Sequence, residues 1–184
     1  MERLAPSARR DPYGSRVGRR HSALVASVVP WLSIAFGSVL PIFVIATAMP
    51  IAPPVGFIMF VCWRLVRPGL LPAWAGVPLG IFDDLFNGQP FGFAILFWSL
   101  AVLAIDAVEA RFPWRSFGLD WITAALLILL YIFAGMVVSG AVLAGPLFVA
   151  VIPQLVLSVL LVPVAARMVA ALDRLRLRRW RRAG

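Results

Sequence analysis

The sequence predicts an all-α integral membrane protein with six transmembrane helices and both termini in the cytoplasm. Apolar residues make up 62% of the 184 residues and charged residues only 14%, and the mean hydropathy is +0.95. Average soluble domains contain about 45–50% apolar and about 25% charged residues, and a chain this short could not bury such an apolar excess. The composition therefore excludes a soluble enzyme, a coiled coil and a disordered chain.

Two stretches without charged residues, 22–63 and 121–166, are the clearest signs of spanning helices. A helix needs about 20 apolar residues to cross the hydrocarbon core, so each stretch is long enough for two crossings. The first stretch is broken around Pro50 and Pro53-Pro54, and the second at Gly145-Pro146. Proline marks these breaks because it does not continue a helix and disfavours helical geometry at the residue before it.

Similar breaks at Arg67-Pro68-Gly69, at Gly88-Gln89-Pro90 and at Pro113 separate two more helices between these stretches. Asp120 precedes an apolar run, and we expect its carboxylate to cap the fifth helix. The expected helices are 24–49, 54–67, 70–86, 91–110, 120–143 and 147–170.

The arginines set the orientation of the six helices. All 17 basic residues are arginines, and with six crossings every one of them falls on the side of the membrane that holds both termini. The positive-inside rule makes this side the cytoplasm. We therefore expect a basic cytoplasmic tail over 1–22, a six-helix membrane domain over 23–170 and a basic cytoplasmic tail over 171–184.

The second and third helices are short, which leaves an alternative topology with four crossings and one re-entrant hairpin over 51–86. That hairpin would hold Arg64 and Arg67 near the middle of the membrane, at a cost of several kcal/mol. We favour two short or tilted crossings in which both arginines extend to the cytoplasmic interface. Asp106 and Glu109 lie near the same interface and are expected to pair with arginines there, namely Arg64, Arg67, Arg111 or Arg115.

The densest group of polar and turn-forming residues lies between the third and fourth helices. Gly88 suits the left-handed position that ends a helix, and Pro90 suits the start of the next one. Asp83 and Asp84 lie near the negative end of a helix dipole and point about 100° apart, so one could face inward and the other the interface. The candidate motif and partner-contact residues are Gly80, Asp83, Asp84, Asn87, Gly88, Gln89, Pro90 and Gly92.

Three interpretations of the two carboxylates stay open. Both could reach the outer headgroup layer, or at least one could be held by polar groups at a helix junction or partner contact, as ionisable residues inside membranes usually are. A proton or cation site is the third interpretation.

Nothing in the sequence supplies a catalytic group: Cys62 and His21 are each the only residue of their kind, so we expect no catalytic residues, no metal and no cofactor.

Small residues four positions apart predict close helix packing. Gly76 and Gly80 form one such pair and Gly135 and Ser139 another, and this spacing lets helix backbones approach closely. Packing within the chain is the favoured interpretation, with an oligomer or partner contact as the alternative.

The C-terminal tail interleaves leucines and Trp180 with arginines. A basic helix that lies on anionic lipid accounts for this pattern, and a docking arm for a cytoplasmic partner is the alternative. Basic tails can also bind nucleic acid, but beside membrane spans they mark the cytoplasmic side, so no nucleic-acid partner is expected. The expected lipid or cytoplasmic contacts are Arg174, Arg176, Arg178, Arg179, Arg181 and Arg182.

The turn between the third and fourth helices has the pattern Gly-x-x-x-Asp-x-x-x-Gly-x-Pro-x-Gly, formed by Gly80, Asp84, Gly88, Pro90 and Gly92. This pattern resembles the hallmark of the rod shape-determining protein MreD family, with Asp83 as an additional acid. The length, the six-helix layout and the cytoplasmic termini are similar over about 24–170.

The resemblance implies a non-enzymatic scaffold of the cell-elongation (rod) machinery in the bacterial inner membrane, which supports cell shape and lateral peptidoglycan synthesis. Its implied partners are membrane lipids, the bitopic protein MreC, the wall glycosyltransferase and transpeptidase, and the actin-like MreB filaments. The implied fold is similar to the substrate-binding subunits of energy-coupling-factor transporters. Two alternatives stay open: a substrate-binding subunit of a small-molecule (vitamin-type) transporter, and a proton- or cation-coupled carrier.

Overall fold

The protein is all-helical over the part of the chain that its computed structural model describes, which is residues 17–44, 52–112, 114, 116–140 and 145–177. Within these ranges the structure describes the backbone alone for residues 17–26, 44, 145–150 and 177. The elements in chain order are α1 (Val17–Val44), α2 (Val55–Val66), the short 3-10 helix η1 (Ala73–Ala75), α3 (Gly76–Phe86), α4 (Phe93–Arg111), α5 (Phe117–Val138) and α6 (Gly145–Leu177).

Three helical segments are long and apolar enough to cross a membrane: Phe93–Arg111, Phe117–Val138 and Val151–Arg176. Two shorter apolar helices, Ser27–Phe43 and Val55–Val66, accompany them in the described residues. The described residues therefore confirm an all-helical fold with helices of the length and composition of membrane spans, and six crossings stay a prediction.

The helix boundaries differ from expectation at four places. α1 begins at Val17, and the rest of its expected range after Val44 lies outside the described residues. The third helix starts later, because residues 67–72 form turns before η1. α6 continues past 170 to Leu177. α5 begins at Phe117, and its cap is Ser116, whose hydroxyl accepts a hydrogen bond from the Leu119 amide at 3.4 Å. The expectation that Asp120 caps this helix is wrong, since Asp120 lies within the first turn.

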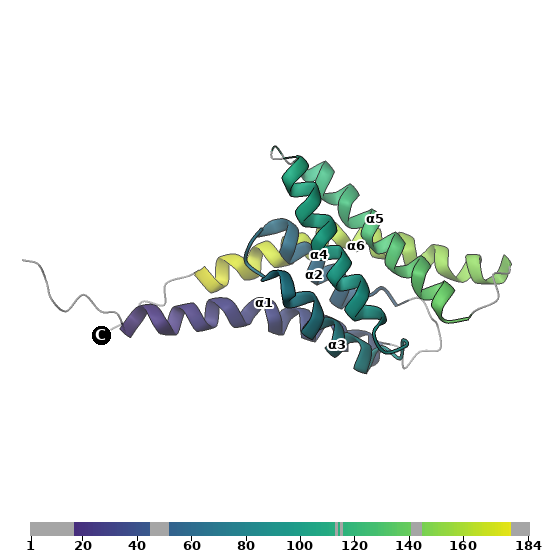
Figure 1. Cartoon of the computed structure of the whole chain (residues 1–184), viewed down its shortest axis with the longest axis horizontal. Coiled ribbons are helices and arrows are strands. Elements are labelled where there is room, and N and C mark those ends of the chain that lie inside the picture. Colours follow the sequence, from purple (N-terminus) through teal and green to yellow (C-terminus); the bar gives the residue numbers. More distant parts are fainter. Residues whose placement is uncertain (1–16, 45–51, 113, 115, 141–144, 178–184) are drawn as a thin grey trace, which may run out of the picture.

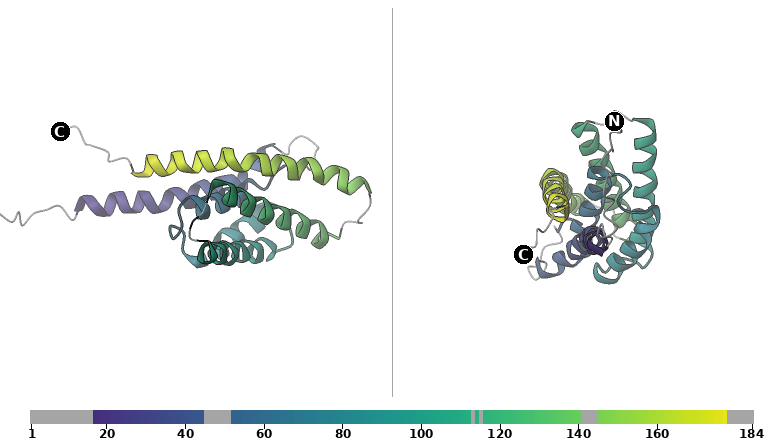
Figure 2. Two further views of the ribbon diagram at one scale, coloured as in Figure 1. Left: turned by 90° about the horizontal axis from the view of Figure 1, so that it is seen from above. Right: turned by 90° about the vertical axis from the view of Figure 1, so that its left-hand side faces the viewer.

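Two long helices, α1 and α6, run antiparallel along the molecule, and the Val17 end of α1 lies at the same end as the Leu177 end of α6 (Figure 1). The remaining helices pack to one side of this pair (Figure 2). α2 is the central helix, because it contacts α1, α4, α5 and α6. α3 packs mainly on α4 and α1.

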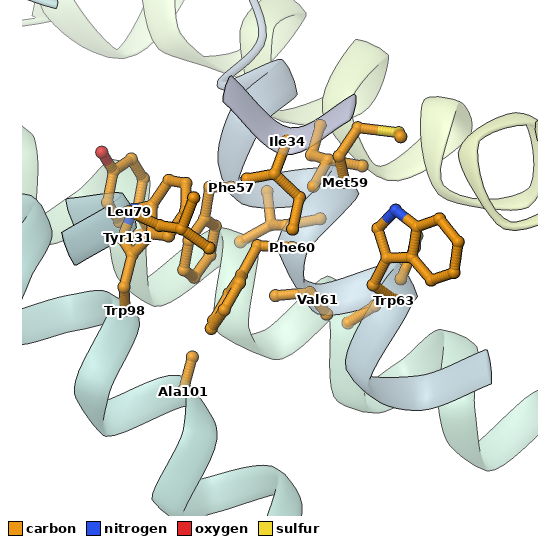
Figure 3. Close-up of a cluster of buried hydrophobic side chains, with 14 of the residues drawn as sticks. Ile34, Phe57, Met59, Phe60, Val61, Trp63, Leu79, Trp98, Ala101 and Tyr131 are labelled. Carbon is orange, nitrogen blue, oxygen red and sulfur yellow. The ribbon is translucent and has the colours of Figure 1, made fainter. Parts of the chain in front are cut away.

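The core is built around α2, in which ten of 12 residues are buried. A helix that is apolar on all sides is typical of a buried position. Phe57 stacks on Tyr131 with ring centroids 4.4 Å apart, and Phe60 stacks on Trp98 at 4.9 Å (Figure 3). The outer faces of α4, α5 and α6 carry exposed leucines such as Leu103, Leu126 and Leu160, as expected of helices that face lipid.

Candidate functional site

The candidate site begins where α3 and α4 touch through their backbones. A Cβ atom placed on Gly80 would lie 2.6 Å from the Ile95 Cα, and one placed on Gly76 would lie 2.9 Å from the Ser99 amide nitrogen. No side chain fits at such distances. The four-residue spacing puts both glycines on the face of α3 that contacts α4. The structure thus places this pair at a helix contact within the chain.

Asp84 caps α4 although it belongs to α3. Its carboxylate accepts hydrogen bonds from the backbone amides of Gly92 and Ala94, both at 2.8 Å, and from the Ile95 amide at 3.4 Å. Gly92 occupies the cap position itself with φ +98° and has no side chain to cap with. The first amides of a helix lack partners within the helix and carry positive partial charge. Asp84 therefore satisfies three amides that have no partner within α4.

Two glycines and one proline shape the turn between α3 and α4. Gly88, with φ +66°, follows the last residue of α3 and its cap Asn87, which is the position where glycine commonly ends a helix. The expectation that Pro90 begins α4 is wrong. It lies three residues before Phe93, and its carbonyl accepts a hydrogen bond from the Phe93 amide at 3.1 Å. This turn brings the α4 amides back to Asp84.

Asp83 faces a different set of partners. Its carboxylate accepts hydrogen bonds from the Asn87 side-chain amide at 2.7 Å and from the Tyr131 hydroxyl at 3.1 Å. Both aspartates are buried, at 2% exposed for Asp83 and 6% for Asp84. The interpretations that place one or both of them at the surface are therefore wrong. The reason is that α3 packs on α4 and α1: Asp84 is directed at the amides of α4, and the Tyr131 hydroxyl of α5 covers Asp83.

Tyr131 extends the polar cluster to the 87–92 turn. Its hydroxyl points out of the apolar core (Figure 3) and lies 3.2 Å from the Gln89 side-chain oxygen. A hydroxyl donates only one proton. Because that proton goes to Asp83, Gln89 can form a hydrogen bond with Tyr131 by donating from its NH₂ group to the hydroxyl oxygen. This orientation exchanges the side-chain oxygen and nitrogen of Gln89, two atoms of nearly equal size.

A cavity of about 290 Å³ adjoins this cluster. Gln154 of α6 lies at the wall of the cavity, and the Gln154 side-chain amide donates to the Ala52 carbonyl at 2.9 Å. The cavity wall combines neutral polar side chains with prolines and apolar residues. The lining residues are Pro41, Ala52, Pro53, Pro54, Asn87, Gln89, Tyr131, Ile132, Gly135, Met136, Ser139 and Gln154.

The structure places Gly135 and Ser139 at the wall of this cavity. A Cβ atom on Gly135 would meet the Phe93 ring at an ordinary 3.6 Å and the Gln89 side-chain nitrogen at 3.9 Å, and the hydroxyl of Ser139, the C-cap of α5, donates to the Met136 carbonyl. Sequence reasoning did not single out Tyr131 and Gln154. The signal that could have found them is that each is an isolated large polar side chain in the charge-free stretch 121–166.

Arginines gather at the other end of α2. Arg64 is buried, donates to the Leu71 carbonyl at 2.6 Å and forms an ion pair with Asp106. The expected Arg64–Asp106 pair is confirmed: the buried Arg64 side chain reaches the carboxylate of Asp106, which is about half-exposed at the protein surface. Arg67 is about half-exposed and pairs with Asp173 at 2.7 Å, so this arginine finds its carboxylate on α6.

The C-terminal arginines divide into two groups. Arg174 is exposed. Arg176 is turned toward the protein, where it pairs with Asp173 at 2.7 Å and lies over the Trp63 ring at 5.7 Å, so its side chain does not face outward as a lipid contact would. The other expected contacts lie outside the described residues: Arg178, Arg179, Arg181 and Arg182.

No group of three or more His, Cys, Asp or Glu side chains that could hold a metal ion occurs in the described part of the chain. Cys62 is buried, with its sulfur 3.8 Å from the Val162 carbonyl. The chain matches no protein-family model, no curated protein and no solved structure. The geometry of the α3–α4 junction, the cavity beside it and the sequence pattern are therefore the basis for assigning a function.

Proposed function

We propose that this protein is a non-enzymatic scaffold of the bacterial cell-elongation complex, in the inner membrane. In this role it supports cell shape and lateral peptidoglycan synthesis by binding an MreC-like bitopic protein and, with it, the wall glycosyltransferase and transpeptidase. Contact with actin-like MreB filaments would be direct or through these partners. The chain would cross the membrane six times, with both termini in the cytoplasm.

The observation that carries this proposal is that the residues of the MreD-like pattern serve one junction. Gly80 permits the backbone contact between α3 and α4, Asp84 caps α4, and Gly88 and Gly92 supply the two left-handed turn positions. The Pro90 carbonyl closes the turn. If the match to this short glycine-rich pattern were due to chance, we would not expect every residue of the pattern to have a distinct role in the same junction.

Two features support the proposed topology. Arg64, Arg67 and Arg176 lie where α2 and α6 end, at the end of the molecule from which α1 starts (Figure 1), as the positive-inside rule requires of a cytoplasmic face. The second feature is that α2, at 12 residues, is about 18 Å long and so is shorter than the hydrocarbon core. Other helices surround it, so its ends can meet protein instead of lipid.

The decisive experiment is a mild-detergent pull-down of the tagged protein from its host membrane, with identification of the co-purifying proteins. Recovery of a bitopic periplasmic coiled-coil protein together with wall synthases is the expected result. Recovery of ATPase subunits with a transmembrane coupling protein would overturn the proposal.

A variant series then tests the α3–α4 junction. Asp84→Ala is expected to reduce partner recovery and rod shape, whereas Glu109→Ala, an acid near the arginine-rich end, is expected to leave both unchanged. Size-exclusion profiles in detergent separate loss of binding from loss of folding. If Asp84→Ala is folded and recovers its partners normally, the junction is not required for the complex.

The cavity favours a second candidate function, a substrate-binding subunit of a small-molecule (vitamin-type) transporter. Its volume of about 290 Å³ lies at the lower end of the range of small-molecule sites, and several neutral polar side chains line it. A radiolabelled vitamin retained through purification would favour this function. Purified protein that binds nothing in a broad ligand screen would count against it.

A further inference from the structure

The wall of the cavity beside the α3–α4 junction is polar but carries no charge. Its polar side chains are those of Asn87, Gln89, Tyr131, Ser139 and Gln154. The segments 24–63, 68–105 and 121–166, which supply every residue of the wall, contain only two charged residues, Asp83 and Asp84. Neither of these two lines the cavity. Because a charged ligand needs an opposite charge to offset its lost hydration, the wall suits an uncharged ligand.

The orientation of two side-chain amides at this wall is fixed by their partners. The Asn87 amide donates to the Asp83 carboxylate at 2.7 Å, and the Gln154 amide donates to the Ala52 carbonyl at 2.9 Å. Carbonyl and carboxylate oxygens accept hydrogen bonds, so in both cases the NH₂ group must face the partner. The oxygen of each amide therefore lies on the other side of the group, and neither oxygen accepts a hydrogen bond from the described residues.

The hydroxyl protons at the wall are already used inside the protein. The Tyr131 hydroxyl donates to Asp83 at 3.1 Å, and the Ser139 hydroxyl donates to the Met136 carbonyl at 2.8 Å. The prolines of the wall have no backbone N–H. Each side-chain amide keeps one further N–H, but its oxygen can accept two hydrogen bonds. The wall therefore offers more acceptors than donors, and a fitting ligand supplies N–H groups together with an acceptor.

The rest of the wall is apolar and is held in place by the core. It includes Pro41, Pro53, Pro54, Ile132 and Met136. The Tyr131 ring stacks on Phe57 with ring centroids 4.4 Å apart, and the Gln154 hydrogen bond to Ala52 ties α6 to the segment before α2. Walls that are ordered before binding reduce the entropy cost of binding. The volume of about 290 Å³ lies at the lower end of small-molecule sites and suits a single ring with one polar group.

We propose that the cavity binds an uncharged, ring-sized ligand with a carboxamide group, which forms hydrogen bonds with the side-chain amides of Asn87 and Gln154. The ligand N–H groups donate to the amide oxygens, and the ligand oxygen accepts from the remaining amide N–H groups. The ring packs on the prolines and on the apolar side chains of the wall. The proposal rests on the cavity that favours the second candidate function, and it names the class of ligand for that cavity.

The test uses the full chain in lipid nanodiscs and measures binding by calorimetry, with empty nanodiscs as the blank for partition into lipid. Four probes of nearly equal size separate charge from hydrogen bonding. Benzamide is uncharged and has N–H donors, methyl benzoate is uncharged and has none, benzoate is an anion, and benzamidinium is a cation. Saturable binding of benzamide is expected, with each of the other probes weaker by at least about tenfold.

Two variants at the wall test the site itself. Gln154→Leu removes one amide at similar size and is expected to weaken benzamide binding by at least about tenfold. Ser139→Trp places a large side chain at the wall and is expected to abolish binding, which keeps the proposal testable if Gln154→Leu does not fold. Glu109→Gln, at the arginine-rich end, is the control and should bind benzamide as the wild type does.

The proposal is overturned if the wild-type protein shows no saturable binding of benzamide or binds any of the other three probes as tightly. It is also overturned if a folded Gln154→Leu or Ser139→Trp variant binds benzamide as tightly as the wild type. The measurement needs no partner protein, so its result is separate from that of the pull-down. Benzamide binding without ATPase subunits in the pull-down would support the ligand class and count against a transporter, whereas ATPase subunits without benzamide binding would overturn the ligand class alone.

Discussion

Replacement of Gly80 with alanine tests the contact on which the α3–α4 junction depends. The new Cβ atom would lie 2.6 Å from the Ile95 Cα and 2.7 Å from its nitrogen, whereas ordinary contact begins near 3.4 Å. Because both neighbours are backbone atoms, α3 and α4 must separate by roughly 1 Å. Overpacking of this kind costs about 1–3 kcal/mol.

Two other contributions act on the same variant. Separation of the helices lengthens the hydrogen bonds from the Gly92 and Ala94 amides to Asp84, and loss of a helix cap costs about 1 kcal/mol. Alanine recovers about 1 kcal/mol through its higher helix propensity. These two contributions offset each other, so we expect Gly80→Ala to lower the free energy of unfolding by about 1–3 kcal/mol.

Reversible unfolding by titration with sodium dodecyl sulfate in mixed micelles measures this free energy. Gly118→Ala is the matched control, because a Cβ atom there would meet only the Ser116 hydroxyl at 3.9 Å. The control is expected to be as stable as the wild type, or more stable by up to about 1 kcal/mol. Equal stability of Gly80→Ala and Gly118→Ala would refute the close backbone contact.

Three other outcomes follow from the packing. Phe57→Ala removes a fully buried ring that stacks on Tyr131 and should lower the free energy of unfolding by about 3–5 kcal/mol in the same titration. The control Leu126→Ala, at an exposed position, should change it by no more than about 0.5 kcal/mol. Similar changes for the two variants would contradict the assigned core. Asp106→Ala leaves the buried Arg64 without its counter-charge and should cost about 1–3 kcal/mol, partly restored in Asp106→Asn, and an unchanged midpoint would show that the pair does not contribute. Cys62 is buried, so a membrane-permeant maleimide should label it only after unfolding, and rapid labelling of the folded protein would argue against that position.

Signals that act along the chain made part of the fold predictable. Proline and glycine placed the starts and ends of α2 and α4 within three residues, because these residue types restrict or release the backbone wherever they occur. Gly88 was expected at the end of a helix and has the left-handed φ of such a position. The Arg64–Asp106 pair was also within reach, since both residues were expected near the same interface.

Contacts between distant segments could not be predicted from the same signals. Asp84 caps α4 only because the turn from Gly88 to Gly92 brings the α4 amides back to α3, and no sequence rule gives that path. Arg67 meets Asp173 across 106 positions. The error at the start of α5 has a local cause: Ser116 and Asp120 are both common cap residues, and the choice between them depends on where the loop ends.

The cap that Asp84 places on α4 has a consequence for how the chain is made. α3 leaves the ribosome before the residues that its carboxylate needs, since the Gly92 and Ala94 amides are eight and ten positions further along. Until those residues are synthesised, a charged side chain in an 11-residue helix has no stable place in lipid. α3 and α4 should therefore enter the membrane together as one helical hairpin. A stop codon placed after Phe86 should leave α3 outside the membrane, on the side that faces the ribosome.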